Sequence, residues 1–268
     1  MIRTLKHDVD DSIERLLIVS DVHAFIEPLH VFDKLRAAMR GKSQVVFNGD
    51  LYCGGVRPVE ATDWVMRNAG ELATLGNHDE DALRGNEGSQ PPFTEAGAWQ
   101  RLRDDQRDWL RIRPHRLELS WRGRRIVAMH GHLTREGRPI PWYATPEEQI
   151  AAFGESDADL CLTGHTHFAF VRQSHNIHVA NSGSMFAAIV ARDERGVIRA
   201  QSGKPEVSPD DETRCSFLSV TESQQKVHVE IVRFDYDRKA SIVELERAEH
   251  AYLRDYRRLL LEGIVPAG

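Results

Sequence analysis

Short apolar runs alternate with longer amphipathic stretches in the first third of the chain. Leu16–Ser20, Val45–Asp50 and Glu71–Leu75 are brief, largely apolar runs, and each predicts a buried strand. Pro28 and Pro58 open the two stretches between them, where apolar residues recur with the period of a helix. The order strand, helix, strand, helix, strand predicts a right-handed parallel βαβαβ unit.

The middle of the chain breaks this rhythm. Residues 80–114 are polar and rich in glycine and proline, and they end in a charged helical piece around Ala98–Leu110. They form an insertion that either caps a site or is a surface excursion. Leu117–Trp121 and Arg124–Met129 then predict a hairpin. After it come a helix capped by Thr145, with Glu148 completing its capping box, and strands at 160–163, 168–172 and 177–180.

The last fifth of the chain has a different pattern of hydrophobic residues. Phe217–Thr221 and Lys226–Phe234 alternate like the strands of a hairpin, and Ser241–Leu261 has the apolar period of one helix. This helix either packs on its own domain or forms the contact of a homodimer. We expect a single domain of residues 1–268, with a core at about 16–190, residues 201–214 as a link, and residues 215–268 packed on the core.

Composition narrows the class of protein. The chain has 268 residues, 41% hydrophobic and 28% charged, which suits one large globular domain. A net charge of −6 gives no signature of nucleic-acid binding, and no apolar stretch is long enough to span a membrane. Three widely spaced cysteines do not make a disulfide framework, and the charged first residues lack the features of a signal peptide. We therefore expect a cytoplasmic protein.

Side chains of types that can bind metals follow five of the predicted strands. They are Asp21 and His23, then Asp50, then Asn77 and His78, then His130 and His132, and finally His165 and His167. Open α/β sheets place their ligands at the carboxyl ends of strands, so these side chains are expected to converge. Imidazole and carboxylate together suit Mn, Fe, Zn or Ni. Seven or more donors exceed the needs of one ion and predict two divalent ions sharing a bridging carboxylate.

The ordered set of motifs resembles the calcineurin-like metallophosphoesterase superfamily, in the form of its small bacterial and archaeal phosphodiesterase or phosphatase branch. The motifs are Asp21-x-His23, Gly49-Asp50, Gly76-Asn77-His78-Asp79, His130-Gly131-His132 and Gly164-His165-x-His167. The resemblance implies an α/β fold, a four-layer α/β/β/α sandwich of two mixed sheets flanked by helices. It also implies hydrolysis of a phosphomonoester or phosphodiester by in-line attack of a metal-bridging hydroxide.

The resemblance further implies a role for each residue of the motifs. Asp21, His23 and His167 would hold one ion, Asn77, His130 and His165 the other, and Asp50 would bridge them. His78 would protonate the leaving oxygen and Asp79 would orient His78. His132 would lie near the substrate phosphate, or it would contact and orient the residues that bind the metals. Manganese is the expected metal, with Fe, Zn or Ni as alternatives.

Two positions depart from the family pattern. Cys53 stands where relatives often have a second Asp, and Gly54 stands where the protein phosphatases have Arg, which argues against a phosphoprotein substrate. Cys53 either binds metal or packs as an inert thiol. The segment 181–184 lacks the proline of the corresponding family turn, and we expect Gly183 to carry a similar turn.

The substrate stays open among phosphorylated small molecules and nucleotides, including dinucleoside polyphosphates. Arginines of the insertion either meet a polyanionic substrate or pair with the interleaved carboxylates of a solvated helix face. Trp142 and Tyr143 either stack on a base or pack in the protein. A different class of function is a scaffold that keeps the fold without catalysis, but scaffolds of this kind typically lose a metal ligand or the His of the Asn-His pair, and none is lost here.

Overall fold

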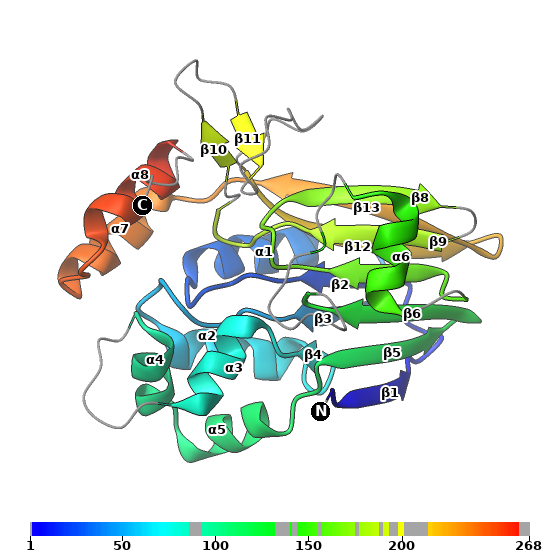
Figure 1. Ribbon diagram of the computed structural model, residues 1–268, viewed down its shortest axis with the longest axis horizontal. Coiled ribbons are helices and arrows are strands. Elements are labelled where there is room, and N and C mark those ends of the chain that lie inside the picture. Colours follow the sequence, from blue (N-terminus) through cyan, green and yellow to red (C-terminus); the bar gives the residue numbers. More distant parts are fainter. Residues whose placement is uncertain are drawn as a thin grey trace.

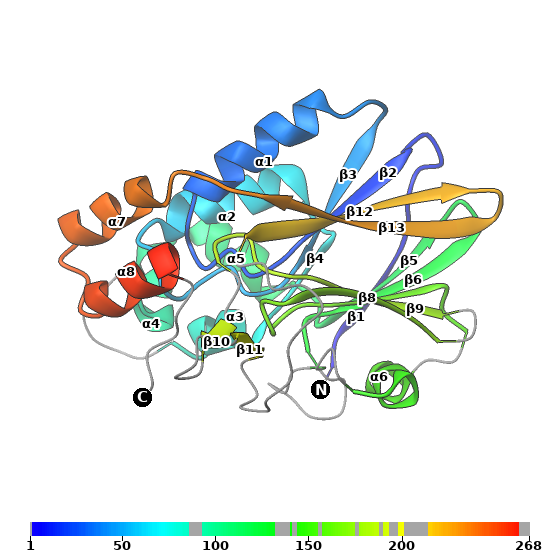
Figure 2. The same cartoon turned by 90° about the horizontal axis from the view of Figure 1, so that it is seen from above.

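Two mixed sheets lie face to face and are flanked by helices, as Figures 1 and 2 show. The computed structural model describes residues 2–85, 93–131, 140, 144–154, 157–174, 177–187, 190–192, 198–200 and 214–262. The first sheet has the order β13 (Lys226–Phe234), β12 (Cys215–Ser223), β2 (Arg15–Val19), β3 (Ser43–Asn48), β4 (Ala73–Thr74). The second has the order β1 (Thr4–Asp8), β5 (Arg116–Trp121), β6 (Arg124–Met129), β7 (Leu160–Thr163), β9 (Ile177–Ser182), β8 (Ala169–Ser174). The predicted fold class is confirmed.

Helices cover the outer faces of both sheets. Helices α1 (Glu27–Ala38) and α2 (Pro58–Asn68) connect the parallel strands β2, β3 and β4, which confirms the βαβαβ unit. Helix α6 (Pro146–Phe153) lies on the outer face of the second sheet (Figure 2). Its predicted capping box is present, because the Thr145 hydroxyl accepts a hydrogen bond from the Glu148 backbone N–H at 3.2 Å.

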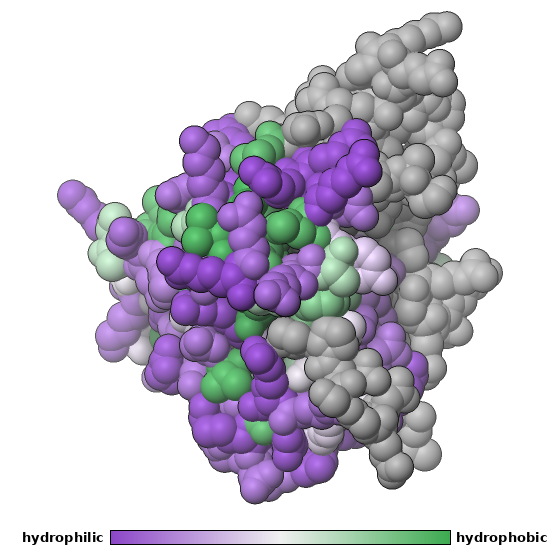
Figure 3. Space-filling model, turned by 90° about the vertical axis from the view of Figure 1, so that its left-hand side faces the viewer, coloured by the Kyte–Doolittle hydropathy of each residue, from purple (hydrophilic) through white to green (hydrophobic). Residues whose placement is uncertain are grey.

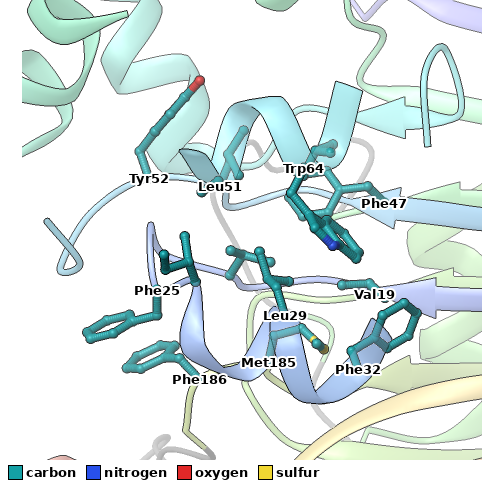
Figure 4. Packing of buried hydrophobic residues seen from close by; sticks show 14 of the residues in the cluster. Val19, Phe25, Leu29, Phe32, Phe47, Leu51, Tyr52, Trp64, Met185 and Phe186 are labelled. Carbon is teal, nitrogen blue, oxygen red and sulfur yellow. The ribbon is translucent and has the colours of Figure 1, made fainter. Parts of the chain in front are cut away.

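The alternating side chains of β2 explain the layers. Leu16 and Ile18 lie in the apolar core between the two sheets, whereas Leu17 and Val19 lie in the core beneath the helices. All four are completely buried, so this strand has no polar face, as expected for a parallel strand covered on both sides. Figure 4 shows Val19 packing beside Phe32 of α1. The ends of β2 and β3 are thereby fixed by dense packing on both faces.

Several elements differ from the sequence expectation. Strand β1 was not predicted, because Thr4–Asp8 is an edge strand that alternates exposed and half-buried residues and has no apolar run. The C-terminal hairpin does more than pack on the core, since β12 pairs with β2 and extends the first sheet. Two short strands, β10 (Val190–Arg192) and β11 (Ile198–Ala200), pair with each other and with no other strand in the described part of the chain.

The two long helices that periodicity predicted are each divided. Helix α3 (Asn77–Arg84) extends into the insertion, which also contains α4 (Glu95–Arg101) and α5 (Asp104–Arg111), and the backbone is extended at Leu102, directly after α4. The C-terminal segment contains α7 (Arg238–Arg247) and α8 (Leu253–Glu262). They are separated where Glu249 takes a positive φ and the next residue, His250, bonds to the Gly54 carbonyl oxygen through Nε2 at 2.9 Å. A tertiary contact thus overrides the helical period.

The end of the molecule that carries α7 and α8 has a mixed surface. Figure 3 views this end and shows hydrophobic side chains in separate groups among hydrophilic ones. Val243, Tyr252 and Leu261 are exposed by 40, 60 and 52%. The alternative that this end forms a homodimer contact stays a prediction. None of the described helices has the length and apolar character needed to cross a membrane.

Candidate metal centre

The loops that follow β2 and β3 lie side by side at the carboxyl ends of these two strands. The two strands pair in parallel register, so their carboxyl ends coincide. The backbone N–H of Asp21 donates to the Gly49 carbonyl at 2.9 Å, and the N–H of Val22 donates to the Asp50 carbonyl at 2.9 Å. Asp21, His23 and Asp50 are therefore brought together by backbone pairing that continues beyond the strands.

Five residues of the site hold an uncommon backbone conformation. Their φ angles are 55° at Asp21, 51° at His23, 60° at Asp50, 69° at His165 and 56° at His167. Side chains other than glycine rarely occupy this left-handed region, and each such residue costs roughly 1–2 kcal/mol. Strain of this kind persists only where the surrounding structure imposes it, and it is concentrated at functional sites.

Asp21, His23 and His167 form the first donor group, in which the ligating atoms lie within 4.8 Å of one another. The Nε2 atoms of His23 and His167 face each other at 3.0 Å, and Asp21 Oδ1 lies 3.2 Å from His167 Nε2. The Nδ1–H of His23 donates to the Cys53 carbonyl at 2.9 Å, which leaves Nε2 to face the group. Imidazoles that ligate metals are commonly oriented through such a second hydrogen bond.

Asp50, His130 and His165 form the second donor group. Asp50 Oδ2 lies 3.0 Å from His130 Nε2, and the Nδ1–H of His130 donates to the Asn48 carbonyl at 2.7 Å. The same oxygen of Asp50 lies 3.9 Å from His23 Nε2 in the first donor group. The other oxygen accepts the backbone N–H of His78 at 3.0 Å. One carboxylate oxygen therefore faces both donor groups.

Several donor atoms of the site are buried without a hydrogen-bond partner. They are Asp21 Oδ1, Asn77 Oδ1, His130 Nε2, His165 Nδ1 and His167 Nδ1. Buried polar atoms in proteins are almost always paired, and leaving one unpaired costs about 1–3 kcal/mol. These orphaned atoms, together with a donor set of carboxylate, amide and imidazole, fit divalent cations.

The charges of the site also favour cations. Burial opposes ionisation of Asp50, but the imidazoles of His130, His78 and His23 outweigh it and hold the pKa of Asp50 below its usual range. Burial likewise lowers the pKa of His130, but the carboxylates of Asp50 and Asp21 raise it to about 9. Burial lowers the pKa of His165 to about 4. Both carboxylates are thus ionised in a site with little access to solvent, where a cation is strongly attracted.

The aromatic residue Phe186 packs against both imidazoles of the first donor group. Its ring centroid lies 5.0 Å from that of His23 and 5.5 Å from that of His167. It stacks on Phe25 at 4.8 Å with the rings nearly parallel, and Figure 4 shows the pair side by side. Rigid apolar contacts of this kind limit the orientations open to both imidazoles.

The turn at residues 181–184 has the role that sequence analysis expected. Gly183 has φ +74°, and its N–H donates to the side-chain oxygen of Asn181 at 2.8 Å. The Ser184 hydroxyl donates to the Asp21 carbonyl at 3.0 Å, so the turn holds the loop of the first donor group. A residue larger than glycine at 183 would collide with Ser216. The turn therefore forms without the missing proline.

The carboxylate beside His78 is Glu95, not Asp79. Glu95 Oε1 accepts a hydrogen bond from His78 Nδ1–H at 2.7 Å. Asp79 instead accepts the backbone N–H groups of Asp50 and Gly76 at 2.9 Å and of Leu51 at 2.8 Å. Asp79 therefore fixes the loop that carries Asp50, which corrects the expectation that it orients His78. Gly76 is required in this arrangement, because a Cβ there would collide with Asp50.

His78 and Glu95 form an ion pair that is about three-quarters shielded from solvent. Burial lowers the pKa of His78, but hydrogen bonds with Cys53 and Glu95 and the charge of Asp50 raise it to about 12. The hydrogen bond from His78 lowers the pKa of Glu95 to about 2. The imidazole lies beside the first donor group, with its centroid 5.2 Å from that of His23. A proton donor is thus held at the edge of the site.

Glu95 was not predicted as a site residue, because nothing in the sequence around it distinguishes it. It is the first residue of α4 and follows the N-cap Thr94, where an acidic residue is common on helix grounds alone. The insertion also contacts the site at Phe93, whose carbonyl accepts the Gly54 N–H at 2.9 Å. The insertion therefore touches the loop that follows Asp50, and only the tertiary structure reveals it.

Arginines of the insertion pair with neighbouring carboxylates. Arg103 contacts Asp63 and Asp105, and Arg111 contacts Asp108 at 2.6 Å. These contacts support the interpretation of a solvated helix face. His132, Trp142 and Tyr143 lie outside the described residues.

Comparison with known proteins assigns the family. The family model of the calcineurin-like phosphoesterase superfamily domain matches residues 15–201. The chain belongs to this superfamily, as its motifs suggested. No curated protein sequence matches the chain.

Solved structures share the fold at low sequence identity. A metallophosphoesterase from Sphaerobacter thermophilus is 20% identical with a TM-score of 0.69, covering 91% of this chain and 98% of its own. A hypothetical protein from Pyrococcus horikoshii is 12% identical with a TM-score of 0.69, covering 94% and 99%. A proposed diadenosine tetraphosphatase is 14% identical with a TM-score of 0.51, covering 86% and 98%. These likenesses concern the fold.

Proposed function

We propose that the chain is a dinuclear metal-dependent phosphoesterase. The observation that carries the proposal is the position of Asp50, whose Oδ2 faces both donor groups at once. The first donor group would hold one divalent cation. His130 and His165 would hold the other together with Asn77, whose side-chain oxygen is buried and unpaired. Asp50 would be shared between them.

Two bound divalent cations would lower the pKa of a shared water and neutralise the oxygens of a phosphoryl group. The protein supplies the rest of the chemistry. His78, charged and fixed through Nδ1 by Glu95, would give a proton to the leaving oxygen. Asp79 would keep Asp50 in place by holding three backbone N–H groups of the loops around it. Manganese is the metal we expect, with iron, zinc or nickel as alternatives.

The substrate would be a phosphomonoester or a phosphodiester, of a small molecule or a nucleotide. The name of one structural neighbour, a proposed diadenosine tetraphosphatase, supports keeping dinucleoside polyphosphates among the candidates. A panel of monoesters, diesters and nucleotides, with turnover measured on each, would choose among them. Arg103 and Arg111 of the insertion give no support to a polyanionic substrate, because Asp63, Asp105 and Asp108 engage them.

Removal and return of metal test the proposal. We expect a chelator to abolish hydrolysis of an aryl phosphate or aryl phosphodiester, and Mn²⁺ to restore it. Asp50→Asn should stay inactive under the same conditions. Asp108→Asn is the matched control, since Asp108 is 72% exposed and pairs only with Arg111 among the contacts described. If Mn, Fe, Zn and Ni all fail to restore turnover on the whole panel, a scaffold without catalysis becomes the better account.

A further inference from the structure

A third group of metal-binding side chains lies against the proposed catalytic centre. Cys53, His78 and Glu95 place a sulfur, a nitrogen and an oxygen within 4.8 Å of one another. We propose that this third donor group is an inhibitory site for a soft divalent cation such as Zn²⁺. The proposal rests on the proposed function, because the inhibition would act through His78.

The three donors come from three different segments, and each segment is fixed. Cys53 has φ +77°, and its carbonyl is held by His23 Nδ1–H at 2.9 Å. The next residue, Gly54, donates its N–H to the Phe93 carbonyl at 2.9 Å, which ties this loop to the segment that carries Glu95. His78 lies in the first turn of α3, and its N–H donates to Asp50 at 3.0 Å. The group is therefore arranged before any ion arrives.

The chemistry of the third donor group differs from that of the other two. The first and second donor groups contain only oxygen and nitrogen, which suit Mn²⁺ as well as Fe, Zn or Ni. A thiolate with imidazole and carboxylate is a donor set that favours Zn²⁺, and a zinc site with three protein ligands keeps its fourth position for solvent. Cys53 is also the partly exposed cysteine, whereas Cys161 and Cys215 are buried.

Geometry permits an ion after a small movement. Zinc bonds of about 2.0–2.1 Å in a tetrahedral site separate two light ligand atoms by roughly 3.3 Å. His78 Nδ1 and Glu95 Oε1 are 2.7 Å apart, so the Glu95 side chain must withdraw by roughly 0.6 Å. About a quarter of each side chain is exposed, 29% for His78 and 26% for Glu95, so an ion can enter from solvent.

Binding of zinc at this group would block proton donation. An imidazole whose Nδ1 carries a metal cannot take a second proton, so the charged form that gives up a proton is lost. Zinc would replace the proton on His78 Nδ1, and that proton and the proton of the Cys53 thiol would both pass to solvent. Zinc would thus inhibit without displacing the catalytic ions, and it would inhibit most where the leaving oxygen most needs a proton.

Titration of the Mn-loaded full chain with Zn²⁺ tests the proposal by two independent readouts. We expect one zinc to bind per chain with manganese retained, and turnover of an alkyl phosphoester to fall. Cys53→Ser, with inhibition measured against its own turnover without zinc, should need at least about tenfold more zinc for half inhibition. Cys161→Ala, which removes a thiol outside the group, should behave like the natural chain.

The second readout needs no catalysis. Co²⁺ added to the Mn-loaded chain should give a thiolate-to-metal charge-transfer band that is absent in Cys53→Ser. No such band, no additional zinc, or equal zinc inhibition of Cys53→Ser and the natural chain would each overturn the site. If the Mn-loaded chain has no turnover at all, the proposed function fails, while the cobalt band still decides whether the third donor group binds metal.

Discussion

The strand-end loops and the insertion contribute to one site in different ways. The loops after β2, β3 and β7 carry buried donors on strained backbone, with φ between 51° and 69° at five residues. The insertion contributes Glu95, a residue of ordinary helical backbone that is one-quarter exposed. The loops bring the donor atoms of the first and second donor groups close together. The Glu95 carboxylate accepts the hydrogen bond that orients the side chain of His78. Burial and strained backbone thus distinguish the first and second donor groups, whereas partial exposure distinguishes the carboxylate that pairs with His78.

Replacing His78 should have the largest effect on turnover. With a metal-loaded chain, His78→Ala should slow hydrolysis of an alkyl phosphoester about 10²- to 10⁴-fold, because general acid catalysis contributes this much. The loss should be smaller on an aryl ester, whose leaving oxygen needs less protonation. Steady-state kinetics on both substrates measures the difference. Equal losses on the two esters would assign His78 to binding instead of proton transfer.

Replacing Asp79 should mainly cost stability. Asp79 is 1% exposed and accepts three backbone N–H groups, which an amide side chain cannot do. Asp79→Asn should lower the free energy of unfolding of the metal-free chain by about 3 kcal/mol. Asp108→Asn at the surface should change it by less than about 0.5 kcal/mol. Denaturant unfolding of both variants gives the comparison, and similar values for the two would remove the role assigned to Asp79.

Replacing Glu95 should have a smaller effect that depends on the substrate. Glu95→Gln keeps the shape of the side chain but removes the charge that faces His78. Turnover should fall about 10- to 100-fold on an alkyl phosphoester, the usual effect of losing an orienting partner, and much less on an aryl ester. Recovery by Glu95→Asp on the alkyl ester would strengthen the assignment. A loss that is independent of the leaving group would show that Glu95 acts only on structure.

Much of the site could be predicted from the sequence because each donor follows directly from a strand. The apolar runs before Asp21, Asp50 and His165 are unambiguous. Parallel pairing brings the ends of β2 and β3 together, and likewise those of β6 and β7, whereas the two pairs meet only because the two sheets pack face to face. The roles of Asp79 and Glu95 could not be assigned in this way. Asp79 is adjacent to His78 in sequence but turns toward the backbone of Asp50. Glu95 is distant in sequence and reaches His78 only through the packing of α4 against α3.

The fold shows the same division between local and tertiary causes. Strands β2 and β3 are apolar enough to be predicted by composition alone, whereas β1 is a strand because it pairs with β5. The predicted C-terminal helix is interrupted where His250 bonds to Gly54, a contact of 196 residues in sequence separation. The period of the hydrophobic residues cannot predict contacts between residues so far apart in sequence.

The metal content of Asp50→Ala shows whether one carboxylate serves both ions. Asp50 would do so because its Oδ2 lies 3.0 Å from His130 Nε2 and 3.9 Å from His23 Nε2. Under conditions that load two Mn²⁺ per natural chain, Asp50→Ala should lose both ions together, whereas Asp21→Ala and Asn77→Ala should each mainly lose one. Two manganese ions bound per chain of Asp50→Ala would contradict the account.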